Sequence, residues 1–147
     1  MPPTEAIKNV QVAIGIVIHD GQVLICKRKP RDSFGGYWEF PGGKCETGET
    51  PADCVTRELL EELDIQVTPV RALELIEHRY STACVTLFPF ICRLDSGEAR
   101  PLSASELQWL APTALREYQF PEANTGLIEM LATAGYIEAI DLEADQA

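Results

Sequence analysis

The sequence offers few side chains for histidine or cysteine chemistry. Only two of its 147 residues are histidines, His19 and His78, so a histidine-based triad or a histidine-rich metal site has little to draw on. We expect both to be ordinary turn or strand residues. The cysteines are odd in number and lack any Cys-x-x-Cys spacing, which argues against a disulfide framework or zinc site and favours buried thiols. They are Cys26, Cys45, Cys54, Cys84 and Cys92.

Basic residues and long apolar runs are scarce as well. Lysine and arginine number 12 against 23 acidic residues, which gives a net charge of −11. Such a chain repels duplex nucleic acid, although a small anionic substrate stays open if metal ions supply positive charge. No apolar run reaches the roughly 20 residues of a membrane span, and the N-terminus lacks the pattern of a signal peptide. We therefore expect a cytoplasmic protein with no nucleic-acid or membrane partner.

The length and the hydrophobic share of 46% suit one domain, spanning residues 1–147, with a core of its own. Residues 1–8 and 139–147 are expected to be flexible ends, and the acidic run from Glu138 to Asp145 to be solvated. Asp20-Gly21 predicts a hairpin turn between the first two strands. Strands are expected at 10–18, 23–29, 38–40, 67–80, 84–94 and 106–110, loops at 30–36 and 96–105, and helices from residue 50, over 112–116 and over 124–135.

One helix is predicted with particular clarity. Thr50 is placed to cap its N-terminus with Asp53 three residues on, and Pro51 occupies the favoured first position. Apolar residues then recur at helical spacing and form a stripe that can pack on a core. The stripe consists of Ala52, Val55, Leu59 and Leu63.

The opposite face of that helix carries clustered negative charge. Glu58, Glu61 and Glu62 fall at i, i+3 and i+4, which stacks their side chains on one face. Like charges at this spacing cost about 0.2–0.5 kcal/mol per pair, a cost that Mg²⁺ or Mn²⁺ would offset because hard cations prefer carboxylate oxygens. Taken alone, such a face is more often simply solvated. The Gly-rich turn at residues 40–44 and Arg57, at i,i+4 from Glu61, favour a built site instead.

The segment from Gly43 to Ile65 resembles the Nudix box, G-x5-E-x7-R-E-U-x-E-E-x-G-U with U aliphatic. Every fixed position matches except the last glycine, where Asp64 stands; asparagine and aspartate tolerate the left-handed helix end that this glycine provides. The resemblance implies an α/β/α sandwich with a mixed sheet and hydrolysis of a nucleoside diphosphate linked to a further group. It also implies a metal site with Mg²⁺, or Mn²⁺ in its place. Its ligands would be Glu58, Glu61, Glu62 and the Gly42 carbonyl, with Arg57 among the catalytic residues and Glu49 beside it.

Beyond the box, residues 8–137 look most like MutT-type 8-oxo-dGTP diphosphatases. The residues that carry this likeness are Trp38 to Lys44, Lys27-Arg28 and Phe120 to Asn124. By this resemblance Arg28 contacts phosphate, Phe40 and Tyr80 flank the base, and Asn124 reads oxidised guanine. Taken without the likeness, Arg28 is an ordinary surface residue, the aromatics belong to the core, and Asn124 caps the last helix. The expected substrate-binding residues are Arg28, Glu39, Phe40, Tyr80 and Asn124.

One position departs from the MutT-type pattern. Those enzymes carry a late-loop Glu six residues before a Trp, and if Trp109 matches that Trp, the position here is Ser103. Glu106 lies three residues on, either as a substitute or as a solvated loop residue. The general base is therefore Glu106 or a carboxylate of the box.

Two other functions stay open at this point. One is a Nudix pyrophosphohydrolase that acts on CTP, a methylated pyrimidine triphosphate or a broad range of dNTPs, since substrate preference depends on few pocket residues. The other is a non-catalytic module that binds oxidised guanine, as in the C-terminal domain of adenine glycosylases. Such modules lack the box carboxylates, which are all present here. Monomer and homodimer are both compatible with the sequence.

Overall fold

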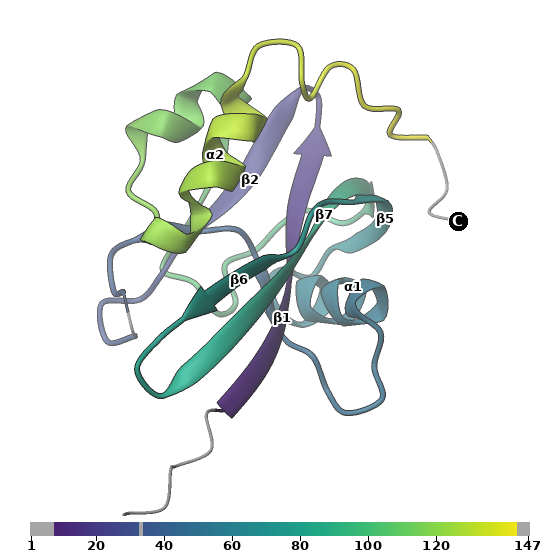
Figure 1. The fold of residues 1–147 in the computed structure, drawn as a ribbon. Coiled ribbons are helices and arrows are strands. Elements are labelled where there is room, and N and C mark those ends of the chain that lie inside the picture. The colour runs from purple at the N-terminus through teal and green to yellow at the C-terminus, as the bar shows by residue number, and fades with distance from the viewer. Residues whose placement is uncertain (1–7, 33, 144–147) are drawn as a thin grey trace, which may run out of the picture.

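The computed structural model describes residues 8–32 and 34–143 (Figure 1). The helices are α1 (Pro51–Leu63) and α2 (Thr125–Ala132), with 3-10 turns η1 (Pro112–Glu117) and η2 (Glu122–Asn124). The strands are β1 (Lys8–His19), β2 (Gln22–Lys27), β3 (Trp38–Glu39), β4 (Gly42–Lys44), β5 (Gln66–Ala72), β6 (Ile76–Arg79), β7 (Ala83–Ser96) and β8 (Glu106–Leu110).

The strands form one mixed sheet with β1 and β7 at its centre. These two long strands pair in parallel from Lys8↔Ala83 to Ile18↔Arg93, and all other pairings are antiparallel. The main order is β3-β2-β1-β7-β5, with β4 on β1, β6 on β7 and β8 on β2. The Asp20-Gly21 hairpin is confirmed, with both residues at positive φ between β1 and β2.

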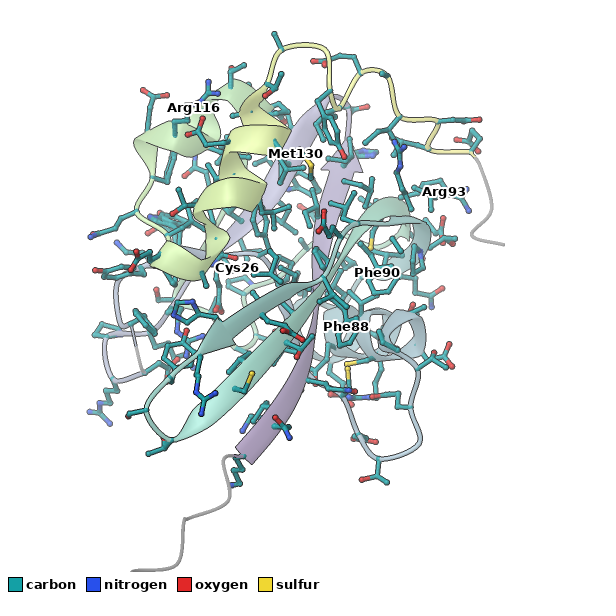
Figure 2. The ribbon with its side chains drawn as sticks, viewed as in Figure 1. Cys26, Phe88, Phe90, Arg93, Arg116 and Met130 are labelled. Atoms are coloured by element: carbon teal, nitrogen blue, oxygen red, sulfur yellow. The ribbon has the colours of Figure 1, made fainter. Side chains whose placement is uncertain are left out.

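Alternating residues of β1 feed two separate cores on opposite faces of the sheet. Ile14, Ile16 and Ile18 belong to the core beneath α2 and η1. Ala13 and Val17 belong to the core beneath α1. Figure 1 shows the two helices on opposite sides of β1, and Figure 2 shows Phe88 and Phe90 of β7 on the α1 side. The expected α/β/α sandwich is confirmed.

Three expected elements differ in the structure. The strand expected over 67–80 is two strands, because residues 73–75 interrupt it and β5 and β6 each pair separately with β7. The Gly-Gly turn is the short strand β4, hydrogen-bonded to β1. The last helix starts one residue later and ends three earlier than expected, since the chain turns through residues 133–140.

The acidic side chains of the expected solvated tail, Glu138, Asp141 and Glu143, are exposed, but its apolar residues are not fully solvated. Ile140 and Leu142 are half-buried against the core beneath α2, and Ile137, just before the tail, is buried. Arg93 of β7 donates a hydrogen bond of 3.1 Å to the Leu142 carbonyl, and Figure 2 shows this arginine beside the C-terminal segment. The rest of the predicted flexible ends, residues 1–7 and 144–147, lies outside the described residues. No helix in the described part of the chain has the length and apolar character needed to cross a membrane.

Candidate active site

Helix α1 is capped as the sequence predicts. The Thr50 hydroxyl accepts a hydrogen bond of 3.1 Å from the Asp53 backbone N–H, and Pro51 opens the helix. At the other end Asp64 adopts the left-handed conformation, φ 59° and ψ 38°, and its N–H bonds to the Leu60 carbonyl. The substitution of Asp for the box glycine therefore leaves the helix end intact.

Arg57 is the centre of the charged network on α1. Its guanidinium holds both oxygens of Glu49, through Nε at 2.7 Å and Nη2 at 2.9 Å. Nη1 donates to Glu58 at 3.0 Å and to Glu61 at 3.1 Å. Nη2 also reaches the Lys44 carbonyl at 3.2 Å. Arg57 thus joins two acids of the helix to the preceding loop, as bidentate arginine–carboxylate geometry favours.

The Glu49 carboxylate is held in its ionised form. The Arg57 hydrogen bonds, with help from the Glu46 backbone N–H, lower the pKa of Glu49 to about 2. The same partnership raises the pKa of Arg57 above its already high value. Glu49 and Arg57 therefore form an ion pair, which matches the expectation that Glu49 lies beside Arg57.

Glycine is required in β4 because the strand passes very close to its neighbours. A Cβ on Gly43 would lie 2.4 Å from the Glu58 carboxyl carbon. A Cβ on Gly42 would lie 2.0 Å from the Ala13 carbonyl oxygen of β1. The two glycines therefore let the backbone of β4 lie directly against the Glu58 carboxylate, whose side chain is only 13% exposed.

Glu62 lies near two other acidic groups, Glu58 and Glu39. Burial first, then the charges of Glu58 and Glu39, raise the pKa of Glu62 to about 7, while the backbone of Gly42 opposes the shift. Burial also raises the pKa of Glu39, against the stabilising influence of Arg28. Crowded carboxylates in partial burial disfavour ionisation together. A cation placed among them would relieve that repulsion.

In their present positions, the side chains supply some of the ligands that a hard divalent cation needs. Glu58 and Glu62 lie together beside Gly42, and carboxylate and carbonyl oxygens suit Mg²⁺ or Mn²⁺. Glu61 instead turns toward Arg57 and is 58% exposed. In the described residues no three Asp, Glu, His or Cys side chains converge on one point. Glu61 would therefore have to leave Arg57 to join the ligands expected for it.

A cavity of about 410 Å³ opens beside these carboxylates. Glu62, Gly42 and Gly43 line one side and the Arg28–Glu39 pair lines another. Arg28 Nη1 donates to Glu39 Oε2 at 2.6 Å, a charge-assisted bond in partial burial. Three of the expected substrate-binding residues, Arg28, Glu39 and Phe40, thus line the carboxylate cavity, and the first two are bonded to each other.

A second cavity, of about 190 Å³, continues from the first and shares Arg28, Glu39 and Phe40 with it. Tyr80 and Asn124 both line it, so the structure brings together all five expected substrate-binding residues along one connected hollow. Phe40 is also a core residue, 3% exposed and stacked on Phe120 with ring centroids 5.3 Å apart. Phe40 therefore packs in the core and also lines the second cavity.

Asn124 is the one polar residue among the buried residues of the described chain. It directly precedes α2, but its side chain makes no capping hydrogen bond. No hydrogen bond of this carboxamide to the described protein atoms is seen, and it faces the second cavity. No fully buried side-chain nitrogen or oxygen in the described residues lacks a hydrogen-bond partner, so the amide atoms stay reachable from the cavity, where water or a ligand can complete their hydrogen bonds.

His78 and Phe34 line the second cavity and were not among the expected site residues. His78 contacts Tyr80 edge to face, with ring centroids 4.6 Å apart. The two are separated by one residue, and the strand expected over 67–80 contains both, so its period of two would have placed them on one face. Phe34 is 45% exposed on a loop, where no such signal exists.

Ser103, at the late-loop position, and Glu106 lie in different places relative to the carboxylate cavity. Ser103 and Ala104 line the carboxylate cavity, whereas Glu106 is exposed at the start of β8 and is not among the lining residues. Glu106 pairs through the backbone with Lys27 of β2. The structure therefore does not bring Glu106 to the carboxylates.

Comparison with known proteins agrees with this fold and site. Residues 13–130 match the NUDIX domain family. An 8-oxo-dGTP diphosphatase of Haemophilus influenzae is 35% identical over 125 residues, covering 84% of this chain and 92% of that protein. A CTP pyrophosphohydrolase of Escherichia coli is 28% identical over 122 residues, covering 83% and 90%.

Solved structures give the same result. The solution structure of the E. coli ORF135 protein matches with a TM-score of 0.77 and 26% identity, over 95% of this chain and 99% of that one. The family match over residues 13–130 and the 35% identical relative identify a hydrolase of phosphoanhydrides. The chain belongs to the Nudix family, whose enzymes generally use divalent metal ions.

Proposed function

We propose that this protein is a metal-dependent pyrophosphohydrolase that converts 8-oxo-dGTP to the monophosphate and pyrophosphate, and so removes oxidised guanine from the nucleotide pool. The observation that carries the substrate is Asn124, a buried amide without a capping bond that faces a pocket beside Phe40 and Tyr80. The 35% identity to an 8-oxo-dGTP diphosphatase supports the same substrate.

The chemistry of base selection follows from the amide. Oxidation at C8 turns guanine N7 from an acceptor into an N–H donor, while O6 remains an acceptor. The Asn124 carboxamide offers one acceptor oxygen and an NH₂ donor, which complement this edge. Unmodified guanine would set N7 against the amide oxygen, two acceptors facing each other. Comparable bidentate contacts discriminate between bases by about 1–3 kcal/mol.

The remaining residues receive roles from their positions. Glu58 and Glu62, with the Gly42 carbonyl, would hold Mg²⁺, and Glu61 would join after leaving Arg57. Bound divalent ions neutralise phosphate oxygens and lower the pKa of water. Arg57 holds Glu58 in position, and Arg28 lies between the two cavities, where a phosphate would pass. Because Glu106 is not at the cavity, we assign the general base to a box carboxylate.

Product analysis with 8-oxo-dGTP, dGTP and dCTP tests the proposal. We expect Mg²⁺-dependent release of monophosphate and pyrophosphate, with kcat/KM for 8-oxo-dGTP at least about tenfold above that for dGTP, as a single discriminating contact of about 1.4 kcal/mol gives. With ¹⁸O-labelled water the label should enter pyrophosphate, as attack at the β-phosphorus requires. Equal values for dGTP and 8-oxo-dGTP would refute the substrate assignment.

A second candidate substrate is CTP, because a CTP pyrophosphohydrolase of E. coli is 28% identical over 83% of this chain. Cytosine presents a donor at N4 and an acceptor at N3, which an amide can also satisfy in a different pose. CTP and dCTP therefore belong in the same panel. A higher kcat/KM for either than for 8-oxo-dGTP would favour this candidate. No hydrolysis of any nucleotide would leave only a binding module.

A further inference from the structure

Strand β4 runs beside helix α1, so residues on one face of the strand and of its continuation lie opposite residues of the helix. Gly43 faces Glu58, since a Cβ on Gly43 would touch that carboxylate. Alternate residues of an extended chain share a face, so Cys45 faces the helix as Gly43 does, and the Cys45 N–H continues the ladder by bonding the Gln11 carbonyl. One turn before Glu58 on the same helix face stands Cys54. The geometry therefore sets Cys45 opposite Cys54.

The two cysteines pack in the same core and differ in access to solvent. Cys54 is fully buried, and the half-buried Cys45 packs against the same core. Burial, and then a hydrogen bond with the Cys45 thiol, raise the pKa of Cys54 to about 12. Cys54 Sγ also donates to the Gly43 carbonyl at 3.5 Å and lies 4.0 Å from Arg57 Nη2. Cys54, and Cys45 opposite it, thus lie next to Gly43 and Arg57, the residues that contact the Glu58 carboxylate.

We propose that Cys45 and Cys54 form a redox modification site, in which a hydroperoxide joins them in a reversible disulfide that lowers turnover. The site is independent of which nucleotide is hydrolysed. It rests on the facing positions of the two cysteines in one core and on the place of Cys54 beside Gly43 and Arg57.

The reaction balances in two steps. The accessible Cys45 thiolate attacks a hydrogen peroxide oxygen, which gives Cys45 sulfenic acid and hydroxide. Cys54 sulfur then attacks the sulfenic sulfur, the S–S bond forms, and the departing hydroxide takes the Cys54 proton as water. Overall, two thiols and one peroxide give one disulfide and two waters. A thiol reductant reverses the change by exchange.

The effect on activity follows from the Gly43 contact. Disulfide formation removes the Cys54 proton and with it the hydrogen bond to the Gly43 carbonyl. It also draws the two sulfurs to bonding distance, about 2.05 Å, which displaces the β4 end relative to α1. Because Gly43 abuts the Glu58 carboxylate, that ligand shifts as well. Loss of such supporting contacts costs about 10- to 100-fold in metal affinity or activity.

The chemical arm of the test needs no substrate, so it is separate from the proposed function. The full chain is treated with stoichiometric hydrogen peroxide and its free thiols are counted, followed by peptide mapping by mass spectrometry. We expect two thiols to disappear and one cross-linked peptide pair joining residues 45 and 54. C45S should abolish the cross-link, and C84S, which removes a half-buried thiol of β7, should retain it. Oxidation of Cys45 to sulfinic acid without a cross-link would overturn the proposal.

The activity arm compares reduced and oxidised protein with any nucleotide that the enzyme hydrolyses in Mg²⁺. We expect kcat/KM to fall about tenfold or more on oxidation and to recover with dithiothreitol, equally in wild type and C84S. C45S and C54A should keep their reduced-state rates through the same treatment, and their melting temperatures establish that they are folded. A cross-link without loss of turnover, or a loss of turnover that persists in C45S, would overturn the coupling to Glu58.

Discussion

Asn124 occupies a position where two residue-scale roles compete. Before a helix, an asparagine usually accepts a hydrogen bond from the helix backbone and so stabilises its first turn. Here the side chain makes no such bond, and it faces the pocket beside Phe40 and Tyr80. The sequence left the two roles open because both need the same residue type at the same place. The direction of the Asn124 side chain in the structure distinguishes the capping role from the base-reading role.

Asn124→Ala should therefore change selectivity more than stability. We expect the kcat/KM ratio of 8-oxo-dGTP to dGTP to fall by about one to two decades, since the discriminating amide is lost. The melting temperature should move little, because no capping bond disappears. Thr125→Ala, a change at the exposed neighbouring residue, is the matched control. A fall in melting temperature with an unchanged ratio would return Asn124 to the capping role.

At the residue scale, we also expect Glu62 and Glu106 to differ in their contribution to kcat. Glu62→Gln keeps the shape of the side chain but removes a charge from the crowded carboxylate group, so kcat should fall by two decades or more, as a loss of about 3 kcal/mol of transition-state stabilisation implies. Glu106→Gln should leave kcat and its pH dependence unchanged, because that carboxylate lies outside the cavity. Steady-state rates at saturating Mg²⁺ decide between them. A large effect of Glu106→Gln would reinstate it as the general base.

At the scale of elements, local signals predicted α1 well and the sheet only in part. The cap at Thr50 and the turn at Asp64 depend on neighbours within four residues, and both are confirmed. The strand β4 depends on pairing with β1, which lies far away in the chain, and the break at residues 73–75 depends on how β5 and β6 each pair with β7. A Gly-Gly dipeptide favours a turn locally. Only the close approach to Ala13 and Glu58 explains why glycines stand in a strand.

This contact between elements gives a prediction with an internal control. Gly43→Ala would place a Cβ against the Glu58 carboxyl, which is the end of a flexible side chain, so this carboxylate must move from its position. We expect little change in melting temperature and a loss of kcat/KM of about tenfold or more. Gly126→Ala in α2 meets open space and should raise stability by about 0.5–1 kcal/mol with unchanged kinetics. Thermal melts and rates of both variants test this. Normal kinetics in Gly43→Ala would mean that Glu58 tolerates displacement.

For the whole molecule, the central β1–β7 pair separates two cores, and the candidate site lies beside α1, which covers one of them. The C-terminal segment completes the other core, through Ile140 and Leu142. Its acidic side chains concealed this, because they are interspersed with the apolar residues along the segment. The deciding partner, Arg93, is 49 residues away from Leu142 and could not be read from local pattern. Long-range packing of this kind is what composition alone misses.

Leu142→Ala tests whether this segment contributes to the fold. Leu142 is half-buried against the core beneath α2, so its truncation should cost about 1–2 kcal/mol, less than the 2–5 of a fully buried leucine. For a chain of this size that corresponds to a fall of about 2–8 °C in melting temperature. Leu102→Ala, at a leucine that is 55% exposed, should stay within about 0.5 kcal/mol of the parent. Because Leu142 lies on the face opposite α1, the stability change should leave kcat/KM intact. Equal melting temperatures for the two variants would mean that the tail is solvated, as its charge suggests.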